Sequence, residues 1–249
     1  MSQINNFEIA KNIIIALSGK LRTLKNEVPE LLQFIEELDS IDFSCTHQFI
    51  ETKRPSKEFL DVLDSVFLNL SNRQVQGLNI SSMARLNWMN IYDGVNIKDL
   101  FIKGMSASRL LGLDGYYASN RISAGLMLIL PKVIYPFHTH LVKEFYYCLS
   151  GKLLIQHDID GKKFILDEGE ISITPEGTLH SLEVVGKTPV LLLYSWLGNL
   201  NAPITIWNKM KSERWEGYSW TRLPGQKWKR SDLRQLSNKD FLDLFSKYS

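Results

Sequence analysis

The chain has 249 residues and a formal net charge of +2, with 44% hydrophobic and 22% charged residues. These proportions are ordinary for a folded globular protein of one domain, and the near-neutral charge argues against a nucleic-acid binder, which normally presents a clustered basic face. Two cysteines, Cys45 and Cys148, are too few for a disulfide framework.

The beginning of the chain does not resemble a secretion signal. Its apolar run extends only from Ile13 to Leu17, between Lys11 and Lys20, and the small-residue cleavage site of a signal peptide is missing. No later run approaches the roughly 20 apolar residues that a membrane-spanning helix needs. The sequence therefore predicts a cytoplasmic protein that does not interact with a membrane.

The first part of the chain predicts helices. Apolar residues recur at helical spacing over residues 7–25, again after Pro29, and again from a point near Pro55, so each helix has one face to bury. We expect residues 1–110 to form a helical region that packs on the rest of the protein as a lid or as a dimer surface, and a homodimer is left open.

Residues 111–200 predict a β-barrel. Short apolar runs alternate with turn signals, such as the hairpin expected around Asp160 and Gly161. This density of strands and turns is typical of a small barrel or jelly roll, so the expected fold class is mainly β with an α-helical N-terminal extension. The predicted strands cover residues 116–121, 125–131, 145–149, 152–158, 163–166, 170–174, 179–185 and 190–196.

Residues 201–249 predict an aromatic-rich segment with a terminal helix. That helix is expected from Ser237, whose hydroxyl can cap it together with Asp240 three positions on. The aromatic rings either pack in the core or form a cage for a cationic group. The candidates for such a cage are Trp88, Tyr92, Trp196, Trp207, Trp215, Tyr218, Trp220 and Trp228.

The chemistry is concentrated in residues 135–151, YPFHTHLVKEFYYCLSG. His138, His140 and Glu144 have the spacing H-x-H-x3-E, and on a strand they share one face. Tyr146 and Cys148 have the same parity. Phe145, Tyr147 and Leu149 have the opposite parity and are expected to pack.

A second stretch, residues 169–180 with the sequence GEISITPEGTLH, supplies another imidazole. A turn built on Pro175 and Gly177 would return the chain so that His180 faces the first stretch. Three imidazoles and a carboxylate predict a metal site, because imidazole suits zinc, copper, iron and nickel and a carboxylate extends the range to manganese.

These two stretches resemble the paired signatures of the cupin superfamily, whose fold is a small double-stranded β-helix with the metal inside. The chain departs from the usual pattern at Lys132, where a glycine is common, and at Val184, where an asparagine is common. Neither position supplies a metal ligand, so the resemblance still implies a cupin barrel.

A narrower resemblance follows from the tyrosines. Tyr135, His140, Glu144 and Tyr146 give Y-x4-H-x3-E-x-Y, followed later by His180. This pattern is similar to the cupin-type dimethylsulfoniopropionate (DMSP) lyases, which cleave that small sulfonium zwitterion to dimethyl sulfide and acrylate. The flanking stretches GLDGYYAS and YSWLGNL also resemble this family. The resemblance is good over roughly residues 110–200.

The resemblance implies a mechanism and a ligand set. The expected metal ligands are His140, Glu144 and His180, with His138 as a ligand or a donor beside them and Tyr146 as a further candidate. The substrate carboxylate would bind the metal, and Tyr146 or Tyr135 as phenolate would take the proton from the adjacent carbon. Zinc and iron are the favoured ions, with manganese, nickel and cobalt as alternatives.

Two other functions fit the same residues. Another metal-dependent cupin enzyme, such as an oxygenase or an isomerase, would use the same ligands. A small-molecule-binding cupin would keep the barrel without needing the tyrosines. The fold alone does not choose among these functions, because one fold hosts many.

Overall fold

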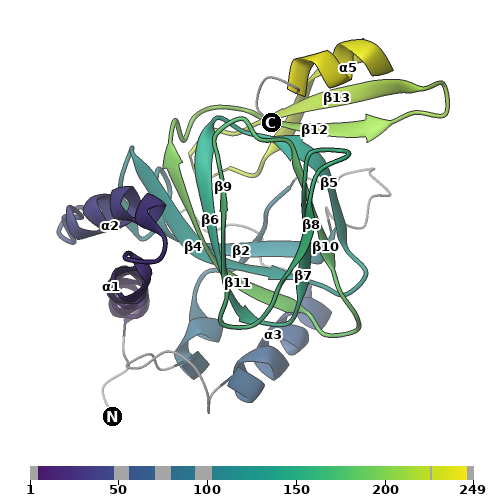
Figure 1. Ribbon diagram of the computed structural model, residues 1–249. Coiled ribbons are helices and arrows are strands. Elements are labelled where there is room, and N and C mark those ends of the chain that lie inside the picture. Colours follow the sequence, from purple (N-terminus) through teal and green to yellow (C-terminus); the bar gives the residue numbers. More distant parts are fainter. Residues whose placement is uncertain (1–4, 48–55, 71–79, 93–102, 225, 246–249) are drawn as a thin grey trace.

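Two β-sheets face each other and enclose the interior of the protein (Figure 1). The computed structural model describes residues 5–47, 56–70, 80–92, 103–224 and 226–245. Strand pairs are antiparallel except for β3, which runs parallel to β2. The first sheet has the order β1 (Met89–Asn90), β2 (Met105–Gly112), β4 (Ile122–Ile129), β11 (Val190–Gly198), β6 (Val142–Ser150) and β9 (Ile171–Thr174), with β3 (Tyr117–Ala118) beside β2.

The second sheet includes the strands that follow the predicted barrel region. Its order is β14 (Lys229–Ser237), β13 (Arg214–Thr221), β12 (Ile204–Lys209), β5 (Ile134–Thr139), β10 (His180–Val184), β7 (Leu153–His157) and β8 (Lys163–Leu166). The hairpin expected around Asp160 and Gly161 is confirmed, because it joins β7 to β8. The strands β1, β2, β12, β13 and β14 were not predicted. The expectation that His138, His140 and Glu144 share one strand is wrong, because the chain turns after Thr139 and continues as β6 in the other sheet.

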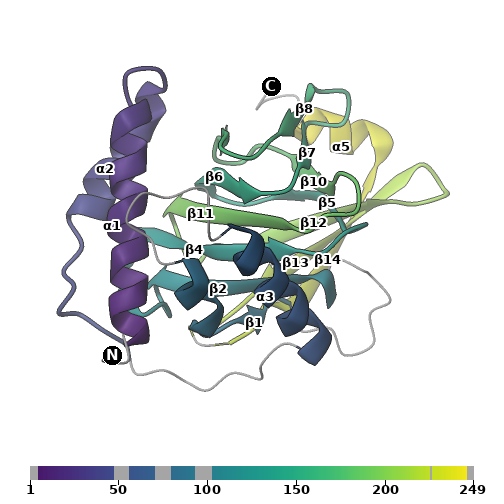
Figure 2. The same ribbon diagram turned by 90° about the horizontal axis from the view of Figure 1, so that it is seen from below.

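The predicted N-terminal helices are confirmed. They are α1 (Asn6–Leu24), the 3-10 turn η1 (Pro29–Leu31) leading into α2 (Leu32–Asp39), and α3 (Lys57–Leu70), followed by the 3-10 helix η2 (Ile80–Arg85). The expected start near Pro55 lies outside the described residues. Figures 1 and 2 show α1 and α2 side by side along one flank of the first sheet, where Phe34 of α2 packs on Phe145 of β6 with ring centroids 5.9 Å apart.

The two faces of β6 serve two separate cores. Phe145, Tyr147 and Leu149 belong to the hydrophobic cluster that the N-terminal helices cover. Tyr146 and Cys148 belong to the cluster between the two sheets. The alternation predicted for this strand is therefore confirmed, and it directs the chemistry-bearing side chains of β6 into the barrel.

The last described element is α5 (Asn238–Phe245), which packs on the far end of the second sheet. The Ser237 hydroxyl accepts a 3.1 Å hydrogen bond from the Asp240 backbone and donates a 2.7 Å bond to its carboxylate, so the predicted cap is confirmed. Trp215 stacks on Phe241 at 4.0 Å. Trp207 and Trp215 are thereby used in packing α5.

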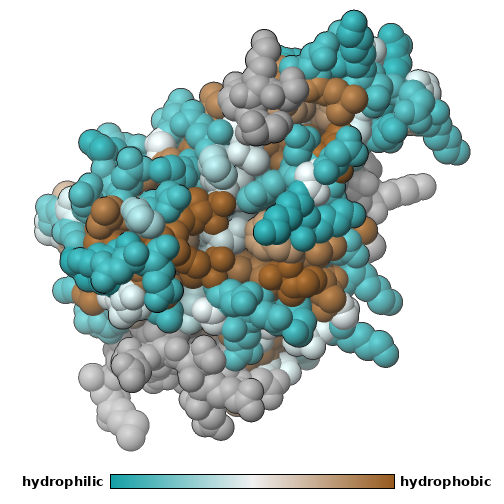
Figure 3. Space-filling view, in the orientation of Figure 1, coloured by the Kyte–Doolittle hydropathy of each residue, from teal (hydrophilic) through white to brown (hydrophobic). Residues whose placement is uncertain are grey.

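Hydrophobic side chains also reach the surface. Figure 3 shows them over the α1–α2 pair and over the part of the second sheet near β8, where Ile165 is exposed. Exposed apolar residues of this kind are normal on folded proteins. None of the helices in the described part of the chain combines the length and hydrophobicity that crossing a bilayer requires.

Candidate active site

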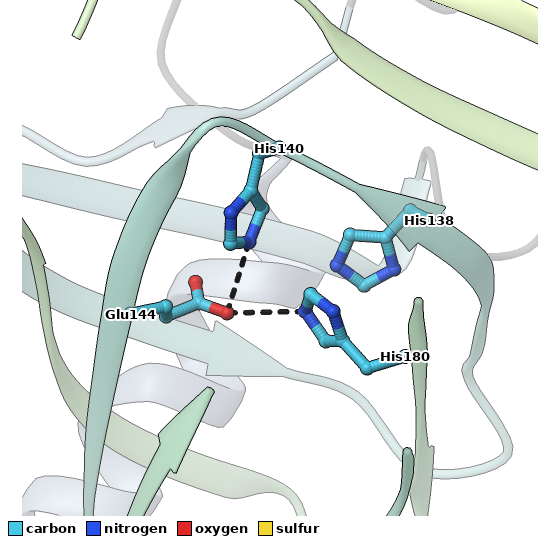
Figure 4. Close-up of side chains that lie close together, drawn as sticks. All are labelled: His138, His140, Glu144 and His180. Carbon is cyan, nitrogen blue, oxygen red and sulfur yellow. Dashed lines mark hydrogen bonds and ion pairs between the residues drawn. The ribbon is translucent and has the colours of Figure 1, made fainter. Parts of the chain in front are cut away.

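Four predicted residues converge between the sheets. His138 lies on β5, His140 follows that strand, Glu144 lies on β6 and His180 begins β10, where it pairs in register with His138. Their potential ligand atoms all lie within 4.8 Å of one another, and all four side chains are buried. Figure 4 shows them pointing toward one another from different strands. The turn at Pro175 and Gly177 therefore returns His180 to the first stretch, as the sequence predicted.

Backbone carbonyls fix the proton on one nitrogen of each imidazole. The Nδ1 atoms of His138, His140 and His180 lie 2.9, 3.1 and 2.9 Å from the carbonyl oxygens of Pro136, Val142 and Thr178. A carbonyl oxygen only accepts hydrogen bonds, so each Nδ1–H must donate. The Nε2 of each neutral ring is then free of a proton and carries a lone pair.

The carboxylate of Glu144 is oriented by a different partner. Its Oε1 accepts a hydrogen bond from the indole Nε1–H of Trp196, and its Oε2 lies 3.2 Å from the Nε2 atoms of both His140 and His180 (Figure 4). With Nδ1 protonated, two imidazole lone pairs face a carboxylate oxygen, which is repulsive unless the rings are doubly protonated or a cation lies among them.

The donor set fits a divalent transition-metal ion. Imidazole nitrogens and a carboxylate oxygen are typical ligands of zinc, iron and manganese. The carbonyls on Nδ1 and the indole on Oε1 are the kind of outer partners that orient metal ligands. The residues that would hold the ion are His138, His140, Glu144 and His180.

Burial and mutual charge govern protonation in this group. Burial, and then the neighbouring His180 and His140, hold the pKa of His138 well below its usual range. Burial alone would raise the pKa of Glu144, but the two histidines on its Oε2 outweigh it and hold that pKa well below its ordinary value. Glu144 is therefore a carboxylate and His138 a neutral imidazole near pH 7, the forms in which they bind metals.

A cavity beside this group contains both predicted tyrosines. It has about 560 Å³ of atom-free space, including its opening to solvent. The chemically important residues of its lining are Tyr92, Arg109, Tyr135, His138, Glu144, Tyr146, Tyr194, Trp196, Arg222 and Trp228.

Tyr146 lines the cavity together with Glu144, one of the candidate metal ligands. Both side chains are buried. Burial, followed by the negative charge of Glu144, raises the pKa of Tyr146 well above its ordinary value. In the protein alone this phenol is neutral, so a phenolate near pH 7 needs a nearby cation.

Tyr135 reaches the same cavity from the second sheet. Its ring stacks on His138 with centroids 3.9 Å apart and 25° between the planes, and its hydroxyl hydrogen-bonds to that of Tyr92. Burial, followed by Tyr92, raises the pKa of Tyr135 well above its ordinary value. Both tyrosines therefore present a hydroxyl close to the histidine group.

One wall of the cavity is aromatic, and only some of the candidate rings named from the sequence belong to it. Trp196, Trp228 and Tyr92 line the cavity. Trp88 packs with the N-terminal helices, and Trp220 stands edge-on to Tyr92 behind the wall. Sequence periodicity could not select among these rings.

Tyr194, Arg109 and Arg222, which also line the cavity, were not singled out from the sequence. Tyr194 shares strand parity with Trp196, so alternation on β11 could have found it. Arg109 is the single charged residue in β2, MSASRLLG, which is a recognisable signal in a buried strand. Arg222 follows β13, and no pattern in the surrounding sequence marks it as a residue of the site.

The other two histidines are half-buried and make hydrogen bonds outside the group. His157 Nε2 lies 3.2 Å from the Thr174 hydroxyl, and His47 Nε2 lies 3.1 Å from the carbonyl of Gly112. Neither belongs to the group of four.

The facing sheets and their buried histidines and glutamate define the chain as a cupin-fold protein, which confirms the expected fold. The family model of the dimethylsulfoniopropionate lyases matches residues 39–192, more than half of the chain. The chain therefore belongs to the DMSP lyase family, and it is an enzyme of the carbon–sulfur lyase type.

The chain is also similar to a curated relative in sequence and to solved structures in fold. Dimethylsulfoniopropionate lyase DddQ of Ruegeria pomeroyi is 24% identical over 189 residues, which are 76% of this chain and 91% of that protein. The crystal structure of DddQ from Ruegeria pomeroyi DSS-3 has a TM-score of 0.59 at 19% identity and covers 79% of this chain and 95% of its own. A chain from the crystal structures of the DMSP lyases RdDddP and RnDddQII has a TM-score of 0.56 at 19% identity, covering 81% and 99%.

Proposed function

We propose that this protein is a metal-dependent lyase that cleaves DMSP to dimethyl sulfide and acrylate by β-elimination, with a tyrosine as the base. The observation that carries the proposal is the presence of the Tyr146 and Tyr135 side chains in one buried cavity with His138 and Glu144. Family membership supports the substrate.

His140, Glu144, His180 and His138 hold the metal in this proposal. A divalent cation bound there supplies Lewis-acid chemistry to the substrate carboxylate and lowers the pKa of nearby oxygen acids. The carbonyl-bound Nδ1 atoms keep the imidazole lone pairs directed at the ion site. Trp196 holds the carboxylate of Glu144 in position.

Tyr146 takes the proton from the carbon next to the substrate carboxylate. The electrons of that C–H bond form the new carbon–carbon double bond, and the electrons of the C–S bond leave with sulfur. Dimethyl sulfide departs as a neutral molecule, so no general acid is needed and no water is consumed. Tyr135 is the alternative base, and its hydrogen bond to Tyr92 orients its hydroxyl.

The aromatic wall holds the sulfonium group. Trp196, Trp228 and Tyr92 form this wall in the cavity that Glu144 also lines. A sulfonium over an aromatic face gains about 0.5 to 2 kcal/mol, more when water is excluded. These rings also keep bulk water away from the proton being moved.

Purified protein loaded separately with zinc, ferrous iron or manganese tests the proposal. We expect dimethyl sulfide in the headspace and acrylate in solution in equal amounts, loss of both after chelation, and recovery on reloading. Elemental analysis should find close to one ion per chain. Equal rates with and without oxygen would separate this lyase from an oxygenase. Absence of dimethyl sulfide under every metal loading would refute the proposal.

A further inference from the structure

The active-site cavity has a cationic end in addition to its histidine group. Arg109 of β2 and Arg222, which follows β13, line the same cavity as Glu144 and Tyr146. They come from the two different sheets. The reaction described above assigns neither arginine a role.

The two guanidinium groups share one carboxylate. Nη1 of Arg109 and Nη1 of Arg222 both bind Oδ2 of Asp114, the second at 2.5 Å. The side chains of Arg109, Asp114 and Arg222 are only 6%, 7% and 9% exposed. No other ion pair of either arginine occurs among the described residues. Two buried positive charges with one buried negative charge leave an excess of +1.

One donor of this group is unpaired. Nε of Arg222 is buried and has no hydrogen-bond partner. A buried donor without a partner is costly, and a second carboxylate would pair it and offset the excess charge. Guanidinium groups suit this ligand because their N–H donors bind both carboxylate oxygens side by side.

The strand register connects the cationic end to the proposed base. Arg109 pairs with Gly125, Gly125 with Tyr194, and Tyr194 with Tyr146, so these four lie in one row across β2, β4, β11 and β6. A Cβ on Gly125 would lie 2.9 Å from the Tyr194 hydroxyl. The Tyr194 ring therefore lies over the glycine, and its hydroxyl points toward the Arg109 end of the row.

We propose that Arg222 and Arg109, with the Tyr194 hydroxyl beside them, form a carboxylate subsite that is separate from the histidine group and binds small carboxylates without a metal. It gives the carboxylate of substrate or product a second anchor in the cavity. The choice of acrylate as its ligand rests on the proposed function, whereas the anion subsite itself does not.

A titration of the metal-stripped protein with acrylate, followed by ligand-observed NMR, tests the subsite. Acrylamide, a neutral molecule of nearly the same shape, is the control ligand. We expect acrylate to bind and acrylamide not to bind. Equal binding of the two, or no binding of acrylate until metal is restored, would overturn the subsite.

Substitution of Arg222 locates the binding. Arg222→Met should weaken acrylate binding about tenfold or more, the scale of a lost charge-assisted hydrogen bond. Arg222→Lys keeps the charge but loses Nε–H and the planar donor fork, so an intermediate loss is expected. Arg121→Met is the matched control, because Arg121 is exposed and pairs with Glu37. Unchanged binding in Arg222→Met would contradict the subsite.

The test remains decisive if a variant fails to fold. Thermal melts identify such a variant, and the comparison of acrylate with acrylamide in the unaltered chain then decides. Failure of the proposed function gives a different result. In that case acrylate binds in an Arg222-dependent way but the metal-loaded protein releases no dimethyl sulfide. If the metal-loaded protein releases dimethyl sulfide but the metal-stripped protein does not bind acrylate, only the subsite is refuted.

Discussion

Tyr146 and Tyr147 are neighbours on β6 whose rings lie on opposite faces of the strand. Tyr146 belongs to the cluster between the sheets and Tyr147 to the cluster under the N-terminal helices. Tyr146→Phe should lower DMSP turnover about a hundredfold or more, the usual scale for loss of a positioned base, with metal largely retained. Tyr147→Phe removes a hydroxyl on the opposite face of the same strand and should keep nearly the parent rate. Initial rates of dimethyl sulfide release check both.

Tyr135→Phe separates the two candidate bases. A loss similar to that of Tyr146→Phe would show that both phenols participate, and a smaller loss would leave Tyr146 as the base. Parent rates in both single variants and in the double variant would exclude either phenol as the base.

The two cysteines should differ in reactivity. Burial raises the pKa of the Cys148 thiol to about 12, whereas Cys45 is exposed. Only the thiolate reacts with alkylating agents, so Cys148 stays unreactive at pH 8 and should remain so up to about pH 10. Mass spectrometry after iodoacetamide treatment should find one label, on Cys45, in the native protein and two after unfolding. Rapid native labelling of Cys148 would contradict its placement inside the barrel.

At the scale of single residues, the site residues that could be predicted are mostly those that lie close together in the sequence. Alternation along β6 correctly placed Glu144 and Tyr146 on one face. His138 lies on β5 of the opposite sheet, so it meets Glu144 across the barrel and not along one strand. Arg222 contacts Asp114 across 108 positions, and no local pattern carries such a pairing. The same holds for Trp196, which reaches Glu144 across 52 positions.

At the scale of elements, α2 tests how firmly the N-terminal helices are attached to the barrel. Phe34 is fully buried against Phe145, whereas Leu32 of the same helix is 46% exposed. Phe34→Ala should destabilise the protein by about 3 to 5 kcal/mol, because it leaves a cavity in the shared core. Leu32→Ala should stay within about 0.5 kcal/mol of the parent. Urea unfolding measures both, and similar midpoints would mean that the helices and barrel do not share a core.

The elements that were predicted are those with a regular apolar period. The helices α1 and α2 have a clear buried stripe, and β11 is a long apolar run. β2 was missed because its serines and arginine are buried on both faces, which removes the alternation. β14 was missed for the opposite reason, since nearly all of its residues are exposed and charged or polar. Pairing with a nearby strand, β4 for β2 and β13 for β14, forms both elements, and the apolar period within one strand does not reveal such a pairing.

At the scale of the whole molecule, the histidine group ties the two sheets together. Glu144 belongs to the first sheet, and His138 and His180 belong to the second. A metal that binds only the folded protein stabilises it by about 2.7 kcal/mol at a free concentration one hundred times Kd. Metal loading should therefore raise the urea midpoint of the entire molecule in a single transition.

Two variants provide the control for this stabilisation. Glu144→Gln keeps the shape of the ligand but removes its charge, and it should abolish most of the gain. Glu176→Gln removes an exposed carboxylate in the turn before His180 and should leave the gain intact. An equal gain in both variants would place the metal elsewhere.

The hydrogen bond from Trp196 to Glu144 gives the protein an intrinsic optical reporter. The Trp196 ring lies 5.1 Å from that of His140, and its indole N–H binds the carboxylate that faces the ion site. A change of charge there should shift or quench the emission of Trp196, whereas Trp215, stacked on Phe241 beside α5, should be silent. Metal occupancy could then be followed in real time by fluorescence without a label, and Trp196→Phe should remove the signal.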